Sequence, residues 1–166
     1  SIAPKINAAG RLDDMAIGIK CLIANNKNEA ENYAKQLVVF NEQRKLVENK
    51  MKDEALSILS KCIVDDNYTI TMYDIKWHQG VIGIVASRLK DKYYRPTITF
   101  AKDDFGLLKG SGRSISSFHL KDALDLVSKK NPDLILTFGG HAMAAGLTIK
   151  LENFKKFCAE FEIIAK

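Results

Sequence analysis

The sequence predicts an α/β fold in which a long linking helix is followed by a mixed-sheet α/β domain with flanking helices. Between Glu29 and Cys62 there is neither glycine nor proline, and apolar residues recur every three or four positions, which is typical of one continuous helix. After Asp65, strand-like apolar runs alternate with helix-like segments. Most of the glycines fall at or after Gly80, at the ends of these elements, where open α/β sheets bind ligands.

The first residues contain one candidate phosphate contact, Arg11, and are expected to continue into a short helix. In residues 7–14, small residues precede Arg11, whose guanidinium suits a phosphate; its alternative role is a surface salt bridge. Asp13 and Asp14 are better placed to cap the helix expected over residues 15–24 than to bind a metal ion. Because the first residue is a serine, we expect a piece of a longer protein.

The helix expected from residue 29 to 62 would be roughly 50 Å long, too long for the core of so small a domain. We therefore expect it to bridge two lobes. A coiled-coil seam is the alternative, but Arg44 interrupts the apolar stripe and the repeat is not strictly heptad. The expected regions are residues 1–24, the connecting helix at 25–64 and an α/β domain at 65–166.

Residues 65–166 are expected to contain five strands and three helices. Short apolar runs rich in β-branched and aromatic residues indicate the strands, and apolar residues at helical spacing indicate the helices. The strands are expected within residues 68–73, 96–101, 106–114, 134–138 and 146–150, and the helices at 81–92, 118–130 and 151–166.

The composition favours a globular cytoplasmic protein. Of the 166 residues, 46% are hydrophobic, and the formal net charge of +5 favours a polyanionic partner such as nucleic acid without requiring one. The three cysteines are widely spaced and odd in number, so neither a disulfide framework nor a zinc site is indicated, and reduced thiols fit a cytosol. No apolar run reaches membrane-spanning length and no signal peptide is indicated, so we expect no membrane contact.

The glycine cluster that follows the expected strand at 134–138 is the first candidate site. Gly139 and Gly140 permit positive φ and let a ligand approach the main chain. Successive N–H groups in such a turn can bind an anion, and His141 at the rim can donate a hydrogen bond to a phosphate oxygen. The alternative is a plain turn between strands with a partly buried histidine whose hydrogen bonds are satisfied.

Residues 110–114 are the second candidate site. Glycines, Gly112 among them, free the backbone, Ser111 and Ser114 offer hydroxyls, and Arg113 can hold a phosphate through two parallel hydrogen bonds. The alternative is a hairpin edge with an exposed arginine.

The segment before the helix expected at 81–92 is a weaker candidate. Trp77 and His78 lie where free N–H groups and the helix dipole favour an anion, and the indole could stack on a base. Equally, Trp77 can fill the core and His78 can cap the helix. We expect His119, at another helix start, to be structural.

Residues 139–146 read Gly-Gly-His-Ala-Met-Ala-Ala-Gly, which resembles the GGHxxAAG signature of the DHH-associated domain, the C-terminal half of DHH phosphoesterases. Residues 7–14, 77–88 and 110–114 resemble, in the same order, segments of the single-strand-specific exonucleases of that superfamily. The resemblance therefore covers nearly the whole chain. It implies that residues 1–24 end a DHH domain and that Ser111, Arg113 and Ser114 help to hold a 5′-terminal phosphate.

The resemblance also implies the substrate-binding portion of an exonuclease that hydrolyses single-stranded DNA from 5′ to 3′. Such enzymes use a pair of Mn²⁺ or Mg²⁺ ions held by aspartates and histidines of the DHH half. This chain has no Asp-His-His run and no HExxH, CxxC, GxSxG or Walker pattern, so we expect no catalytic or metal-binding residue within it. Arg11, Arg113 and His141 would position DNA phosphates without reading sequence, and no protein partner is indicated.

Two other functions remain open. A DHH-family oligoribonuclease or cyclic-dinucleotide phosphodiesterase shares the GGH-type turn, but is not expected to carry the segments at 7–14 and 110–114 in this form, nor so long a linking helix. A non-catalytic nucleic-acid-binding module needs only the mild basicity and a stacking side chain. An upstream Asp-His-His segment would favour the enzymes.

Overall fold

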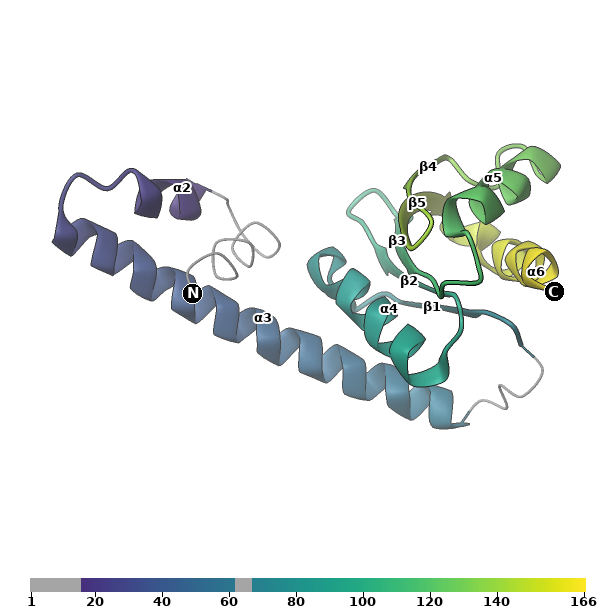
Figure 1. The fold of residues 1–166 in the computed structure, drawn as a ribbon, viewed down its shortest axis with the longest axis horizontal. Coiled ribbons are helices and arrows are strands. Elements are labelled where there is room, and N and C mark those ends of the chain that lie inside the picture. The colour runs from purple at the N-terminus through teal and green to yellow at the C-terminus, as the bar shows by residue number, and fades with distance from the viewer. Residues whose placement is uncertain (1–15, 62–66) are drawn as a thin grey trace. The chain divides into compact units, whose positions relative to one another are not determined.

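The computed structural model describes residues 16–61 and 67–166, and the chain divides into two units, Ser1–Met51 and Lys52–Lys166 (Figure 1). In the first unit, α2 (Ala16–Leu22) precedes the start of α3 (Lys27–Lys61). At 35 residues, α3 is roughly 50 Å long, as the run without glycine or proline predicts.

The second unit is built on a five-stranded mixed sheet with strand order β1-β2-β3-β5-β4. β1 and β2 are parallel and are joined by α4, whereas the other neighbouring strands are antiparallel. The predicted α/β class is therefore confirmed. The elements are β1 (Ile70–Asp74), α4 (Gln79–Tyr93), β2 (Thr97–Lys102), β3 (Leu107–Arg113), α5 (Leu120–Lys130), β4 (Thr137–Gly140), β5 (Ala144–Lys150), a 3₁₀ turn (Leu151–Asn153) and α6 (Phe154–Ala165).

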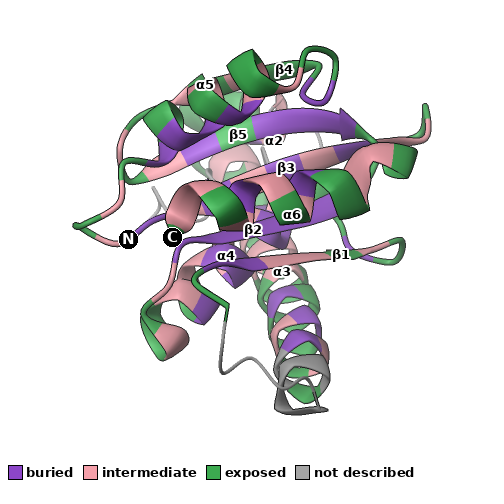
Figure 2. Ribbon diagram, turned by 90° about the vertical axis from the view of Figure 1, so that its right-hand side faces the viewer, coloured by how far each residue is buried: buried purple, intermediate pink, exposed green. Residues whose placement is uncertain are grey.

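The two faces of the sheet are covered by different helices. On one face, α5 and α6 enclose the main core, in which Phe100, Phe157 and Leu124 are fully buried. On the other face, α4 packs on β2 and β3, and the Thr99 hydroxyl donates a hydrogen bond to the Ile82 carbonyl at 2.7 Å. Residues of β3 alternate between buried and half-buried (Figure 2), because successive residues of a strand point to opposite faces.

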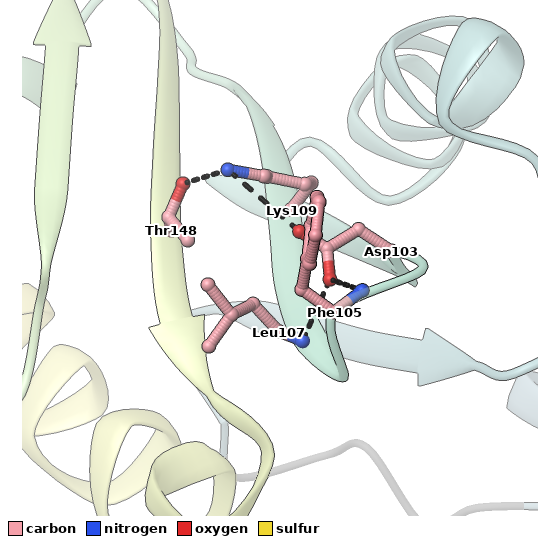
Figure 3. Close-up of polar contacts among 5 residues, drawn as sticks. All are labelled: Asp103, Phe105, Leu107, Lys109 and Thr148. Atoms are coloured by element: carbon pink, nitrogen blue, oxygen red, sulfur yellow. Dashed lines mark hydrogen bonds and ion pairs between the residues drawn. The ribbon is translucent and has the colours of Figure 1, made fainter.

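The β2–β3 hairpin is closed by the side chain of Asp103. Its Oδ1 accepts hydrogen bonds from the backbone N–H groups of Phe105 at 3.0 Å and Leu107 at 2.8 Å (Figure 3). Gly106 has a φ of 84°, a left-handed conformation that favours glycine. The hairpin thus has a defined turn, which fixes where β3 begins.

The start of β1 is tied to α6 by Glu162. One carboxylate oxygen accepts from the backbone N–H of Tyr68 at 2.6 Å, and the other accepts from the N–H and the hydroxyl of Thr69 at 2.9 and 2.6 Å. These charge-assisted hydrogen bonds hold an edge strand of the sheet to the last helix.

The structure differs from the sequence prediction at residues 134–138. The strand there begins only at Thr137, whereas Leu134 and Ile135 lie in the turn after α5 and are buried. The Leu134 N–H donates to the Asn131 carbonyl at 3.2 Å. The apolar run therefore marked a buried turn as well as a strand, because hydrophobicity reports burial and not backbone conformation.

Candidate nucleic-acid interface

On the face that carries α4, strands β5 and β4 expose Gly146, Thr137 and Gly139. Strand register places Gly146 beside Ser111 of β3, and it places Gly139 and Thr137 of β4 beside Gly146 and Thr148 of β5. Paired residues of neighbouring strands point to the same side, so these residues share one face of the sheet. We name this surface the open sheet face; its members are Lys109, Ser111 and Arg113 of β3, Ala144, Gly146 and Thr148 of β5, and Thr137 and Gly139 of β4.

The centre of the open sheet face is bare backbone. Gly146 pairs with Ser111 on one side and with Gly139 on the other. A Cβ at Gly139 would have nothing within 4 Å, and a Cβ at Gly146 would meet only the Gly110 carbonyl oxygen at 3.8 Å. The space above these glycines is therefore available to a ligand, which can approach the main chain closely.

Ser111 and Arg113 lie at one end of this face and contact each other. The Arg113 Nη1 donates hydrogen bonds to the Ser111 Oγ at 3.2 Å and to the Gly112 carbonyl at 2.7 Å. α4 passes close by, since a Cβ at Gly83 would lie 2.8 Å from Ser111 Oγ and 3.0 Å from Arg113 Nη2. A hydroxyl and a guanidinium are thus held side by side next to bare backbone, a combination suited to a phosphate.

Gly112 and Ser114 are not brought to this face. A Cβ at Gly112 would lie 2.6 Å from Leu120 Cδ2 and 3.3 Å from Ile98 Cγ1, so the absence of a side chain lets α5 pack against the sheet. The Ser114 hydroxyl is buried and donates to the Phe118 carbonyl at 2.6 Å. The geometry gives both residues structural roles in place of the phosphate contact that the sequence predicts.

The turn between β4 and β5 places His141 at the edge of the sheet. Gly140 has a φ of 145°, and a Cβ there would collide with the Ala144 carbonyl oxygen. The backbone N–H of His141 donates to the same carbonyl at 2.8 Å, whereas its side chain is exposed. The N–H is therefore used within the turn, and the imidazole is the group of His141 that can reach a ligand.

Trp77 and His78, the two residues before α4, mainly make contacts that stabilise the fold. His78 is the N-cap of α4, where its Nδ1 accepts a hydrogen bond from the Gly80 N–H at 3.0 Å, and its ring is exposed. Trp77 is 3% exposed, so the indole fills the interior and cannot stack on a base. His119 caps α5 by accepting from the Asp122 N–H at 3.2 Å, in keeping with the structural role expected for it.

Arg11 lies outside the described residues. Within residues 16–61 and 67–166, no three His, Cys, Asp or Glu side chains gather in a way that could hold a metal ion. A helix long and apolar enough to cross a membrane is likewise not found in that part of the chain.

Sequence reasoning missed three polar members of the open sheet face: Lys109, Thr148 and Thr137. Alternation along β3 was the available signal for Lys109, because it lies two residues before Ser111 and shares its side of the strand. The threonines join it only through strand register, which pairs Lys109 with Thr148 and Thr148 with Thr137.

A family model for the DHHA1 domain matches residues 65–166, so the chain belongs to the DHHA1 domain family. The resemblance carried by the glycine turn and the neighbouring motifs is therefore confirmed.

The chain is also similar, from end to end, to part of one kind of exonuclease. It is 50% identical over 159 residues to the single-stranded-DNA-specific exonuclease RecJ of Haemophilus influenzae, covering 94% of this chain and 28% of that protein. The RecJ of Escherichia coli is 44% identical over 164 residues, covering 97% and 28%. The chain thus spans a little over a quarter of the curated relatives that it matches.

Solved structures give the same result. The crystal structure of RecJ in complex with Mg²⁺ from Thermus thermophilus matches with a TM-score of 0.85 at 33% identity, over 99% of this chain and 24% of that one. A crystal structure of exonuclease RecJ bound to manganese matches with a TM-score of 0.82 at 32% identity, over 99% and 39%.

Proposed function

We propose that this chain is the substrate-holding part of a RecJ-type exonuclease that hydrolyses single-stranded DNA from 5′ to 3′. The observation that carries the proposal is the Ser111–Arg113 pair beside the bare backbone of Gly139 and Gly146. A terminal phosphate carries more charge than an internucleotide phosphate, and a planar guanidinium binds such an anion through two hydrogen bonds. The similarity to RecJ proteins supplies single-stranded DNA as the substrate class.

The three regions would then have different tasks. Residues 1–24, with Arg11, would end a DHH domain, residues 25–64 would connect it to the second domain, and residues 65–166 would carry the open sheet face. Relatives have been crystallised with Mg²⁺ or Mn²⁺. The described residues do not fit such a centre, so we place the metal ligands in a preceding DHH segment. The metals would activate water and stabilise the leaving oxygen there.

Within this scheme, the residues of this chain bind and orient the strand. Arg113 and Ser111 would hold the 5′-phosphate, the imidazole of His141 would donate to a neighbouring phosphate oxygen, and Gly139 and Gly146 would let the strand lie against the main chain. Such contacts fix register and direction without reading bases. The proposed partner is therefore single-stranded DNA of any sequence, and the proposed location of the protein is the cytoplasm.

The test is Arg113→Ala in the complete protein that contains this chain, assayed with Mn²⁺ on single strands that carry a 5′-phosphate or a 5′-hydroxyl. Losing a charge-assisted contact costs about 1.5–3 kcal/mol, so kcat/KM on the phosphorylated strand should fall roughly 10–100-fold. Turnover of the hydroxylated strand should change little.

The matched control is Lys121→Ala, which removes one exposed charge from α5 on the opposite face of the sheet and should leave both rates unchanged. Unchanged kinetics of Arg113→Ala on the phosphorylated strand would refute the assignment of the 5′-phosphate to this residue. Activity of the wild-type protein on dinucleotides but not on longer DNA would point to the oligonucleotide-degrading relatives.

A further inference from the structure

Lys109 extends the open sheet face beyond the Ser111–Arg113 pair. It lies four residues before Arg113 on the same side of β3, a separation of roughly 13 Å along an extended strand. Its neighbour across the sheet is Thr148, whose next neighbour is Thr137. The bare backbone of Gly146 and Gly139 occupies the row between these threonines and the Arg113 end.

The ammonium group of Lys109 is held in place above the sheet. Its Nζ donates a hydrogen bond to Thr148 Oγ1 at 3.1 Å and lies 3.9 Å from Asp103 Oδ2 (Figure 3). The Lys109 side chain is nevertheless 41% exposed, whereas that of Asp103 is 8% exposed. The hydrogen bond to Thr148 uses one of the three donors of the ammonium, so donors remain for a ligand.

The chemistry of this row suits a phosphate better than a base. The residues of β3, β5 and β4 that form the open sheet face include no aromatic side chain on which a base could stack. They do offer the Lys109 cation and the exposed hydroxyl of Thr137, whereas Thr148 is buried and orients Lys109. In DNA complexes, half or more of the hydrogen bonds that proteins make go to phosphate and sugar. Arg113 and Lys109 therefore place positive charge on either side of the bare backbone of Gly146 and Gly139, an arrangement that suits one DNA strand lying across the sheet.

We propose that Lys109, positioned by Thr148 and next to Thr137, is a second phosphate subsite that binds an internucleotide phosphate of the strand whose 5′-phosphate lies at Arg113. The inference rests on the proposed function and adds to it the direction in which the DNA crosses the sheet. The strand would run from Arg113 over Gly146 and Gly139 to Lys109.

The experiment measures binding by fluorescence anisotropy, using the complete protein in EDTA to prevent cleavage and a short 5′-phosphorylated strand labelled at its 3′ end. Lys109→Gln should weaken binding about fourfold at physiological salt and lower the salt slope by about 0.7, the effect of one lost phosphate contact on a single strand. Oligonucleotides with one neutral methylphosphonate linkage then locate the contact. Neutralising the linkage that Lys109 binds should weaken wild-type binding about fourfold and leave Lys109→Gln unaffected.

Controls separate this contact from a structural role. Lys156→Gln removes an exposed charge from α6 on the opposite face and should change neither affinity nor slope, and Lys109→Arg should keep the linkage effect. If every neutral linkage weakens DNA binding by Lys109→Gln as much as binding by wild type, the subsite is overturned. This holds even if the variant is less stable in urea unfolding. A separate comparison tests the proposed function: if the wild-type protein binds phosphorylated and hydroxylated strands equally, the assignment of the 5′-phosphate to Arg113 fails. The linkage experiment reports on Lys109 and the comparison of 5′ ends reports on Arg113, so the two failures are distinguishable.

Discussion

Replacing Gly83 by alanine tests whether α4 sets the position of Ser111 and Arg113, the pair that we propose to bind the phosphate. The added methyl group would lie 2.8 Å from Ser111 Oγ and 3.0 Å from Arg113 Nη2, both closer than atoms normally approach. These two atoms are at the ends of side chains, so they can move without shifting β3. The expected structural result is a displaced guanidinium on an unchanged sheet.

The variant should therefore affect stability and binding in opposite directions. Alanine in a helix interior is favoured over glycine by about 0.5–1 kcal/mol, so the free energy of unfolding should stay the same or rise slightly. Disturbing the proposed contact of Arg113 with a phosphate should cost about 1.5–3 kcal/mol at most, which corresponds to a loss of affinity of roughly 10–100-fold at most. Simple damage to the fold would lower both quantities together.

Urea unfolding and anisotropy titrations with 5′-phosphorylated and 5′-hydroxylated strands give the two measurements. The contrasting control is Gly110→Ala, whose Cβ would lie 2.5 Å from Phe100 Cε1 and 2.6 Å from Leu147 Cδ2 in the main core. Overpacking there should cost about 1–3 kcal/mol of stability. If Gly83→Ala keeps the full preference for a 5′-phosphate, then either Arg113 does not bind it or α4 does not position Arg113, and the reasoning fails.

Two further predictions concern the fold. Glu162→Gln should lower the free energy of unfolding by roughly 1–3 kcal/mol in urea titrations, because an amide cannot accept all the hydrogen bonds that Tyr68 and Thr69 donate to the carboxylate. The control is Glu152→Gln, at an exposed position. Equal losses of stability in both variants would contradict this role of Glu162. Burial raises the pKa of the Cys158 thiol, so the unfolded chain ionises first and this group's contribution to stability falls as pH rises past the ordinary thiol pKa. Alkylation of Cys158, followed by peptide mapping, should accelerate at a higher pH than for an ordinary thiol, and a profile centred at the ordinary pKa would count against this effect.

The order and type of the elements were predictable because each depends on local spacing. The helical period before residue 62 and the alternating segments after residue 67 are visible in one dimension, and the structure reproduces them. The position of β5 between β3 and β4 was not predictable, since it depends on pairing between segments that are distant in the chain. The prediction at Leu134 failed for a related reason, because a buried turn and a buried strand have the same hydrophobicity.

The sequence-based site residues stay a prediction, but the structure brings only some of them to one face, for one physical reason. A strand was expected within residues 106–114, but Ser111, Gly112, Arg113 and Ser114 were assigned to the phosphate site together, without regard to which side of the strand each faces. In the structure β3 continues to Arg113, so Ser111 and Arg113 share the open side while Gly112 faces the core. The same alternation, applied from Ser111 back along the chain, would have selected Lys109.

Alternation in β3 also explains why glycines flank the proposed binding residues. On the core side, Gly110 and Gly112 leave room for the Phe100 ring and for Leu120 of α5, so the strand can be tightly packed from below. We expect that packing to restrain the backbone of Ser111, which is what a site needs if two side chains are to be positioned for an anion. The two glycines at the end of β4 also have different roles. Gly140 provides the positive φ of the β4–β5 turn, whereas Gly139 is the residue above which a strand of DNA would lie in the proposed complex.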